Sequence, residues 1–587
     1  MNITKVNIKN YRNLNNLNVE LCPGINFILG DNNTGKSNFL DLLKTLFNPT
    51  KMRFESEDFF EKDKAIEIEF SLQLSDAEKG LFDDHFDPNN IDIVNIIATQ
   101  GSDEEGIIYK HKESGEEFNY SKFYRINFFK YDSIRKPENE FTFYKNYGAG
   151  KFLNYLVSPN LATVDSSVIN LSTIKKITEN SNILFKGILP ENLELEIGTQ
   201  DKINDLILRV LTIKDGDGNP LENAGYGTQF TFLILLDILE KLMRIKKRRD
   251  KENFIFTDEN ANRSISMILG IDEPEIHLHP FMQRNLMRFI CELVVNSESR
   301  LDTPGANAIR ELFEIDKING QIMIVTHSPD IIIDIGDSLV YNRIIRFYKK
   351  DSKAIAVSGH SLKLDKIAEK NLHRLFQDVK SAFFSKKVII VEGDTERGAF
   401  PGWFSKLTGK HLDDYGVAIM SAQGGSRDGI KQVQKLLDEF KIPNIGIADR
   451  DSNNNNTTKK SLELFLTEKR NFEEELVETI IDKPDVIHRL FLGYNGDKKY
   501  SIQLNKLTDI SKRYDINNDN IREDLDLSSL LASFEDKQNN ISRDLVKAAF
   551  LAWLELNKSI LLGRYIGEFL DKADIPNVYK NLLNELN

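Results

Sequence analysis

The sequence predicts an α/β protein with two successive strand–helix alternations and a helical C-terminal region. Three observations support this prediction. A glycine-rich loop follows a short apolar strand at residues 30–37, apolar strands that stop at acidic residues recur at 264–273 and 388–392, and residues 481–587 are mainly helical in pattern. Polar residues at the ends of apolar strands are typical of a largely parallel sheet that carries its functional residues at one edge.

Composition sets broad limits on the class of protein. The chain has 587 residues, a formal net charge of −13 and two cysteines, Cys22 and Cys291. Two cysteines cannot build a disulfide framework or a four-cysteine zinc site. No apolar run is long enough to cross a membrane, so we expect a cytoplasmic protein. The negative charge argues against binding nucleic acid over the whole surface, but it permits a local site.

The first alternation begins with alternating apolar residues up to the glycine-rich loop. The spacing predicts a helix over 38–47, a strand over 66–74 and a long helix over 229–249. Residues 155–215 are polar with a helical pattern. A second strand–helix alternation begins at 387 and extends to about 480.

Residues 30–37 read GDNNTGKS, which fits the phosphate-binding pattern G-x-x-x-x-G-K-S/T between a strand and a helix. Gly30 and Gly35 allow backbone N–H groups to turn toward phosphate oxygens, and the helix N-terminus adds positive partial charge. Lys36 would reach the β- and γ-phosphates, and Ser37 would hold Mg²⁺. The other loop residues expected to bind the nucleotide are Asn32, Asn33 and Thr34.

Two later strand ends complete the predicted nucleotide site. The strand SMILGI stops at Asp272 and Glu273, and the strand QIMIV is followed by His327. Asp272 suits the Mg²⁺ shell, Glu273 can polarise the attacking water, and His327 could sense the γ-phosphate. The alternatives are solvated acids at a strand end and a structural histidine.

This order of motifs resembles the ABC-type ATPase heads of the SMC, RecF and Rad50 group over residues 1 to about 350. IKNYRNL at 8–14 is similar to the opening strand of that group. The resemblance implies ATP held between two protomers and an inserted helical dimerisation element at about 155–215. The signature loop would be NAGYGTQ, 223–229, which lacks the usual LSGGQ-like sequence motif. That departure leaves the rate of ATP hydrolysis open, and a helix-capping loop is the alternative.

A second cluster of acids lies at strand ends near residue 390. Glu392 ends an apolar strand, and Glu396 follows about one helical turn later. Asp449 and Asp451 follow another strand, two positions apart, so an extended backbone points both the same way. Four carboxylates at neighbouring strand ends suit hard divalent ions such as Mg²⁺ or Mn²⁺. Solvated acids at strand ends are the alternative.

This pattern, E-x-x-x-E on one strand and D-x-D on a later one, resembles the Toprim domain. An ABC-type head followed by a Toprim domain resembles the OLD (overcoming lysogenisation defect) family, which includes the nuclease subunit of the Gabija phage-defence system. The resemblance implies an α/β fold: an ABC-type ATPase head with its helical insert, then a Toprim domain and a helical C-terminal region. It implies three parts, at 1–375, 376–480 and 481–587.

The same resemblance implies a DNA endonuclease or nickase with two Mg²⁺ or Mn²⁺ ions at the Toprim acids and one more with ATP. Glu392 would be a metal ligand or base, and Glu473 in NFEEE would serve the second metal, with a solvated acidic face as the alternative. Lys558 would stabilise the charged transition state, or be a surface lysine. In SAQGGSRDG, 421–429, the Ser421 and Gly424–Gly425 amides would contact phosphate or a metal-bound water. The implied core metal ligands are Glu392, Glu396, Asp449 and Asp451.

The expected partners are DNA and further copies of the chain, as a homodimer or tetramer. A helicase or a reverse-transcribed DNA element encoded nearby is a further partner that the resemblance allows, and a membrane is not expected. One competing hypothesis is another Toprim chemistry, such as that of a primase or a topoisomerase. The other is a non-catalytic DNA-binding clamp of the SMC or RecF type with a vestigial Toprim domain. That clamp predicts long heptad arms, and no stretch of the sequence sustains a heptad pattern.

Overall fold

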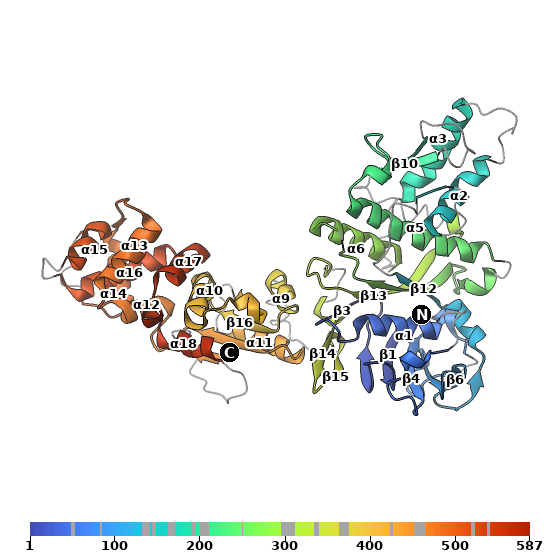
Figure 1. Cartoon of the computed structure of the whole chain (residues 1–587), viewed down its shortest axis with the longest axis horizontal. Coiled ribbons are helices and arrows are strands. Elements are labelled where there is room, and N and C mark those ends of the chain that lie inside the picture. Colours follow the sequence, from blue (N-terminus) through green and yellow to red (C-terminus); the bar gives the residue numbers. More distant parts are fainter. Residues whose placement is uncertain are drawn as a thin grey trace. The chain divides into compact units, whose positions relative to one another are not determined.

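The computed structural model divides the chain into two compact units, Met1–Leu362 and Lys363–Asn587. Each unit is described by itself (Figure 1). The described residues are 1–47, 53–82, 85–131, 141–143, 148–161, 171–188, 195–199, 211–248, 251–276, 278–294, 311–333, 340–362, 375–422, 427–450, 464–517, 523–536 and 541–586. Within them, no helix combines the length and the apolar character needed to span a bilayer.

An antiparallel sheet opens the first unit. Its described strands run in the order β2-β1-β4-β5-β6-β7. Successive side chains of a strand point to opposite faces, so the apolar residues that alternate along β1 and β4 lie on one buried face. The bounds are β1 Asn2–Lys9, β2 Leu17–Glu20, β4 Ile66–Gln73, β5 Ile93–Gln100, β6 Ile108–His111 and β7 Glu117–Phe118.

A second sheet carries the strand ends that matter for function. Its described strands run in the order β11-β12-β13-β3-β14-β15, with β8 also pairing β12. The pairs from β8 through β14 are parallel, which confirms the predicted largely parallel sheet. The bounds are β3 Ile25–Gly30, β8 Asn127–Tyr131, β11 Phe256–Thr257, β12 Arg263–Asp272, β13 Lys317–Val325, β14 Ile344–Lys350 and β15 Lys353–Ser358.

Helix α1, Lys36–Phe47, lies in the core between these two sheets. Its apolar side chains pack with those of β1 and β4 on one side and of β12 and β13 on the other. Figure 1 shows α1 beside β1 and beneath β12 and β13. Burial on both sides fixes the helix whose first turn follows the phosphate-binding loop.

The stretch predicted to be helical, 155–215, contains a small antiparallel sheet as well as helices. Strands β9, Leu195–Thr199, and β10, Leu211–Asp215, pair with each other. Asn182 holds this sheet to α3, because its side chain both accepts from the Ile197 amide at 2.7 Å and donates to the Ile197 carbonyl at 3.0 Å. The helices of this part of the unit are α2 Gly148–Leu161, α3 Leu171–Ile188, α5 Tyr226–Lys246 and α6 Pro280–Val294.

The second unit is built on a parallel sheet. Its described strands run in the order β17-β16-β18-β19, and every pair is parallel. The bounds are β16 Lys387–Val391, β17 Val417–Ser421, β18 Asn444–Ala448 and β19 Leu464–Leu466, with helices α9 Phe376–Ala382, α10 Asp394–Thr408 and α11 Arg427–Glu439. The predicted second strand–helix alternation is confirmed.

The C-terminal helices share one hydrophobic core with this sheet. Ile389 and Val391 of β16 belong to the same cluster as Trp403 of α10 and Trp553 of α16. The predicted helical C-terminal region is thus packed onto the second α/β fold. Its elements are α12 Phe472–Ile480, α13 Pro484–Asn495, β20 Ser501–Ile502, α14 Leu504–Arg513, β21 Leu525–Asp526, α15 Leu527–Glu535, α16 Arg543–Leu556, α17 Ile560–Phe569 and α18 Asn577–Asn584.

Candidate functional sites

The phosphate-binding loop lies between β3 and α1, as predicted. Gly30 has φ +141°, and a Cβ there would lie 2.0 Å from the Phe347 carbonyl oxygen of the adjacent strand β14. Gly35 has φ +101°, and a Cβ there would lie 2.3 Å from the Leu14 side chain. Both positions therefore require glycine, and the loop takes its shape from its backbone and close neighbours.

Lys36 is held in the loop by backbone oxygens. Its Nζ donates to the carbonyls of Gly30 and Asp31, each at 2.8 Å. Burial lowers the pKa of Lys36, and the nearby Glu273 carboxylate opposes that shift. The side chain is thus poised over the loop, where an anion would replace the carbonyls as its partner.

The strand ends that follow β12 and β13 lie beside the loop. Ser37 Oγ donates to Asp272 Oδ1 at 3.2 Å, so the two expected Mg²⁺ ligands already touch. His327 Nε2 lies 3.5 Å from Glu273 Oε1. Burial, and then the Lys36 charge, lower the pKa of His327, which keeps the imidazole neutral near pH 7.

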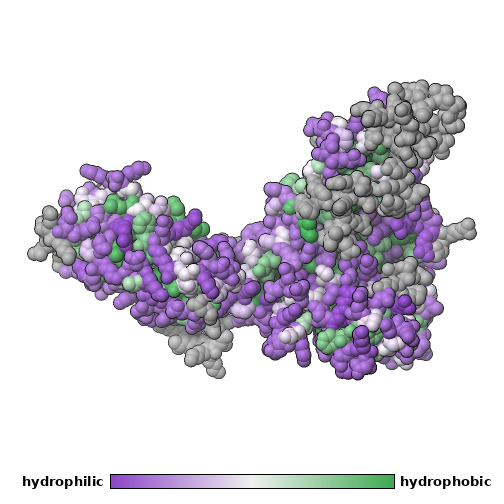
Figure 2. All heavy atoms as spheres, in the orientation of Figure 1, coloured by the Kyte–Doolittle hydropathy of each residue, from purple (hydrophilic) through white to green (hydrophobic). Residues whose placement is uncertain are grey.

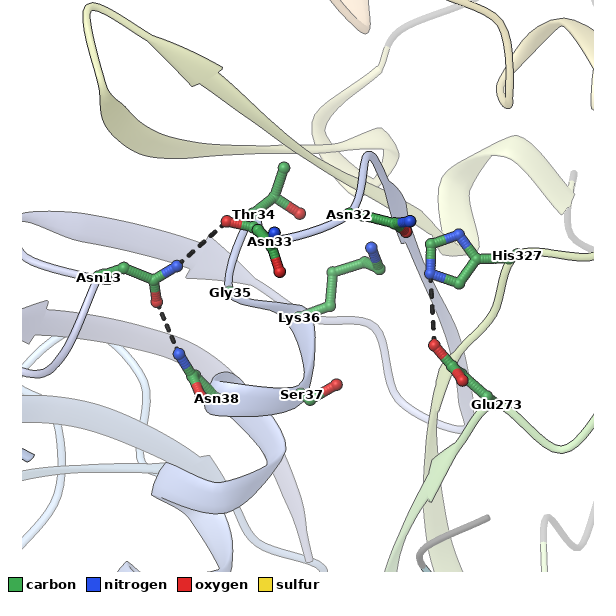
Figure 3. A pocket seen from close by; sticks show the side chains of 10 residues that line it. All are labelled: Asn13, Asn32, Asn33, Thr34, Gly35, Lys36, Ser37, Asn38, Glu273 and His327. Atoms are coloured by element: carbon green, nitrogen blue, oxygen red, sulfur yellow. Dashed lines mark hydrogen bonds and ion pairs between the residues drawn. The ribbon is translucent and has the colours of Figure 1, made fainter. Parts of the chain in front are cut away.

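These residues surround a cavity of about 440 Å³ (Figure 3). The cavity is lined by Asn13, Asn32, Asn33, Thr34, Gly35, Lys36, Ser37, Asn38, Glu273 and His327. Sequence reasoning missed Asn13, whose amide donates to the Asn33 carbonyl at 3.3 Å and accepts from Asn38 at 2.8 Å. Its position in IKNYRNL was the available signal, because a turn follows β1 there.

The predicted signature loop opens α5. The Gln229 side chain is buried and donates to the carbonyls of Glu222 and Ala224, at 3.1 and 2.9 Å. These bonds close the turn that leads into the helix. Gly225 is the N-cap residue of α5, and no side chain caps this helix end. Contact of the loop with a nucleotide on another copy stays a prediction.

The acids of the second unit lie where parallel strands end. Glu392 follows β16, Glu396 lies in the first turn of α10, and Asp449 follows β18. β16 and β18 are paired neighbours, so their C-terminal ends lie at the same edge. Asp451 and residues 423–426 of the glycine-rich segment lie outside the described residues.

Hydrogen bonds tie these acids to one another's segments. The Asp449 amide donates to Glu392 Oε2 at 2.8 Å, and the Phe472 amide at the start of α12 donates to Asp449 Oδ1 at 3.1 Å. Glu473, the next residue of α12, forms an ion pair with Lys558, whose Nζ lies 2.9 Å from Glu473 Oε2. The structure therefore brings together five side chains from four separate stretches of the chain, at 392–396, 449, 473 and 558.

Electrostatics at this edge favour the protonated acids. Burial, followed by the Glu473 carboxylate, raises the pKa of Glu396. Burial, followed by the carboxylates of Glu396 and Glu392, raises the pKa of Asp449. Burial alone would lower the pKa of Lys558, but the carboxylates of Glu473, Glu396 and Glu555 together outweigh it and the net shift is upward. A single ammonium does not neutralise the four carboxylates, so the cluster gains from further positive charge.

The donor set fits a hard divalent ion, although the arrangement is not ready-made. All the donors are carboxylate oxygens, the ligands that Mg²⁺ and Mn²⁺ prefer. Among the residues that the structure describes, no three His, Cys, Asp or Glu side chains already form a metal-binding group. Glu392, Asp449 and Glu473 are engaged by amides and Lys558 instead, so ion binding requires these side chains to turn.

Two glycine pairs fix the position of Lys558 relative to α10. A Cβ at Gly398 or Gly402 of α10 would lie 2.2 Å or 2.6 Å from backbone oxygens of α17. A Cβ at Gly563 or Gly567 of α17 would lie 2.0 Å or 2.7 Å from backbone oxygens of α10. Because α17 begins two residues after Lys558, this close crossing sets where the lysine enters the acidic cluster. Sequence reasoning missed it, although both glycine pairs have the spacing G-x-x-x-G.

The fold and these two sites define a protein that joins an ATPase to a Toprim domain. Residues 1–166 and 156–332 match the AAA ATPase domain family, and residues 383–451 match the Toprim domain of proteins like the overcoming lysogenization defect protein. The chain therefore belongs to the AAA ATPase domain family over more than half of its length, and it also carries an OLD-like Toprim domain, the pair of domains found in nucleases of that kind.

Named relatives agree with that assignment. The chain is 21% identical to Endonuclease GajA of Bacillus cereus strain HuB5-5, over 97% of this chain and 86% of that one. It is 23% identical to the Old nuclease of Escherichia phage P2, over 59% and 52%. The solved C-terminal region of the Burkholderia pseudomallei OLD protein aligns with 35% of this chain and 97% of its own, at 16% identity and a TM-score of 0.24.

Proposed function

We propose that the chain is a divalent-metal-dependent DNA endonuclease or nickase whose activity is controlled by ATP. The observation that carries this proposal is the meeting of Glu392, Glu396, Asp449 and Glu473 with Lys558 at one edge of the second sheet. Carboxylates with raised pKa beside a lysine can hold metal ions and contact a phosphodiester at the same place. The similarity to named endonucleases supports DNA as the substrate.

Each residue of the cluster has a proposed role. Glu392, Glu396, Asp449 and Asp451 hold the first ion, and Glu473 serves the second. Bound there, the two ions would supply Lewis acidity for activating water and neutralising the leaving oxygen. Lys558 exchanges its bond to Glu473 for one to the phosphate, where its charge stabilises the transition state. Glu392 is the proposed base.

The first unit is the proposed control element. Residues 30–37, with Asp272 and His327, bind ATP and one Mg²⁺, and Glu273 orients the attacking water. Lys36 then leaves the carbonyls of Gly30 and Asp31 for the phosphates. Nucleotide binding changes access to the nuclease site.

The proposed assembly and setting follow the similarity to known nucleases. We propose a homodimer or tetramer in the cytoplasm, joined through the part of the first unit at about 155–215, with a role in defence against phage. A helicase or a reverse-transcribed DNA element is a proposed partner. Parts at 1–375, 376–480 and 481–587 remain the proposed functional division.

Incubation of the purified chain with supercoiled plasmid tests the proposal. Nicking or linearisation is expected with Mg²⁺ or Mn²⁺ and none with EDTA, and ATP is expected to change the rate. Glu396→Gln keeps the size of the side chain and removes its charge, so it should abolish cutting. Glu439→Gln, at the end of α11, is the matched control. Cutting that persists in EDTA or in Glu396→Gln would contradict the proposal.

A further inference from the structure

Three large apolar side chains are exposed around Lys558. Leu556, at the end of α16, is 53% exposed, and Ile560 and Leu561, at the start of α17, are 43% and 54% exposed. We call these three residues the apolar rim. Figure 2 shows hydrophobic surface over this part of the second unit, near α17. The Lys558 side chain lies between them in the sequence and is 49% exposed.

The core does not require apolar residues at these positions. Helix α16 buries Trp553 and Leu554, and helix α17 buries Leu562 and Ile566. The rim residues lie outside those buried positions, where polar residues would cost nothing in packing. Another molecule that buried the rim would remove apolar surface from water, which is favourable. The exposed rim therefore points to a ligand.

The backbone that carries the rim is held in place. Asn557 Nδ2 donates to the Tyr500 hydroxyl at 3.0 Å and to the Trp553 carbonyl at 2.8 Å. Ser559 caps α17, because its Oγ accepts from the Leu562 amide at 3.1 Å. The glycine crossing with α10 fixes the helix that follows. The rim is thus presented at a set position relative to Lys558 and Glu473.

Its occupant has to leave the acidic cluster open. A second protein seated on the rim would also cover Lys558, which lies between the rim residues, and would close the site to substrate. A nucleic acid avoids this conflict, since its phosphate meets Lys558 while its apolar part meets the rim. The exposed Arg564, one turn along α17, adds positive charge beside the rim.

We propose that the apolar rim takes a nucleobase next to the scissile phosphate. This inference rests on the proposed nuclease function and narrows its substrate class. A base in an intact duplex is stacked on both faces, so contact with the rim requires that it leave the stack. The site therefore prefers DNA whose bases unstack at low cost: a mismatched or gapped duplex, or a single strand.

Binding and cutting of three labelled DNAs test the inference: a paired duplex, the same duplex with a central mismatch, and its single strand. Anisotropy is measured with Ca²⁺ and cutting with Mn²⁺. The wild-type chain is expected to favour the mismatched duplex over the paired one by about tenfold, the size of partly burying one aliphatic side chain against a base. The variant Ile560→Ser/Leu561→Ser should lose that ratio, and Leu561→Tyr should raise it.

Matched controls separate the possible outcomes. Ile91→Ser changes an exposed isoleucine of the first unit, 66% exposed, and should keep the wild-type ratio. If the chain binds and cuts paired and mismatched DNA equally well, the proposed role of the rim is wrong and the proposed nuclease function stands. If the chain cuts none of the DNAs but prefers the mismatched duplex in a way that depends on the rim, the nuclease function is contradicted and the base contact at the rim is supported. Loss of an oligomer in Ile560→Ser/Leu561→Ser would identify a second copy as the occupant and overturn the inference.

Discussion

The nucleotide site and the acidic site are built in opposite ways. The nucleotide site takes most of its residues from one loop, 30–37, and its cation, Lys36, rests on neutral backbone carbonyls. The acidic site takes its residues from four separate stretches, and its carboxylates repel one another in a buried place. The part of the first site that one copy supplies is therefore shaped before its ligand arrives, whereas the second site is under electrostatic stress that a ligand relieves.

This difference predicts which substitutions should impair each site. A preformed loop depends on a few local residues, so a change there should affect nucleotide binding alone. A cluster drawn from distant segments depends on helix packing as well as on its own acids, so changes far along the chain should reach it. The predictions below test this contrast.

The largest effect is expected from Asp449→Asn, which removes a charge from the centre of the acidic cluster. We expect DNA cutting to fall by more than about a hundredfold, the loss that even outer partners of metal ligands produce. Nucleotide affinity, measured by fluorescence with a labelled ATP analogue, should stay unchanged because the acid belongs to the other unit. A matching fall in both measurements would show that the variant is misfolded.

Lys36→Met should have the next largest effect, on nucleotide binding. Loss of one charged hydrogen-bond donor to phosphate is expected to weaken ATP affinity by about tenfold to a hundredfold. Metal-dependent cutting without ATP should persist, which a plasmid assay measures alongside the binding titration. Unchanged ATP affinity would refute the assignment of this loop.

Gly563→Ala tests whether helix packing supports the acidic site. A Cβ there would lie 2.0 Å from the Thr395 carbonyl oxygen, so α10 and α17 must separate. We expect a loss of about 1–3 kcal/mol in the free energy of unfolding, the usual cost of overpacking, together with weaker Mn²⁺ binding.

Gly429→Ala is its matched control. A Cβ at this helical position has no neighbour within 4 Å, so stability should hold or rise slightly. Chemical denaturation and calorimetric Mn²⁺ titration measure both variants. Equal stability of the two would contradict the close crossing.

The smallest effect is a pH dependence of stability in EDTA. Glu396 and Asp449 have a raised pKa in the folded state, so the folded chain keeps protons that the unfolded chain has released. Their contribution to stability is present below the ordinary carboxyl range, about pH 4, and is lost as the pH rises toward the raised values. The melting temperature should fall over that window, and less so in Asp449→Asn or with Mn²⁺. An unchanged slope in Asp449→Asn would contradict the shift.

The sequence was sufficient for the local parts of both sites. The order strand, GDNNTGKS, helix predicts a loop whose shape depends on neighbours in sequence, and the structure has β3 and α1 at those places. Apolar strands that stop at Asp272, Glu392 and Asp449 likewise predict strand ends, because a parallel sheet collects such ends at one edge.

The parts that the sequence left open depend on contacts between distant segments. Nothing in NFEEE distinguishes Glu473 from its neighbours, and only the fold brings it to 2.9 Å from Lys558. The glycines of α10 and α17 are spaced alike, but which helices cross is decided by the shared core. Strands β9 and β10 escaped notice because both are short and flank a polar stretch.

The most direct test of the account is a crystal of the chain grown with Mn²⁺ and measured for anomalous scattering. We predict peaks between the carboxylates of Glu392, Glu396 and Asp449, with Lys558 moved away from Glu473. A cluster that stays free of manganese while the Ser37 and Asp272 site is filled with nucleotide and metal would contradict the nuclease assignment.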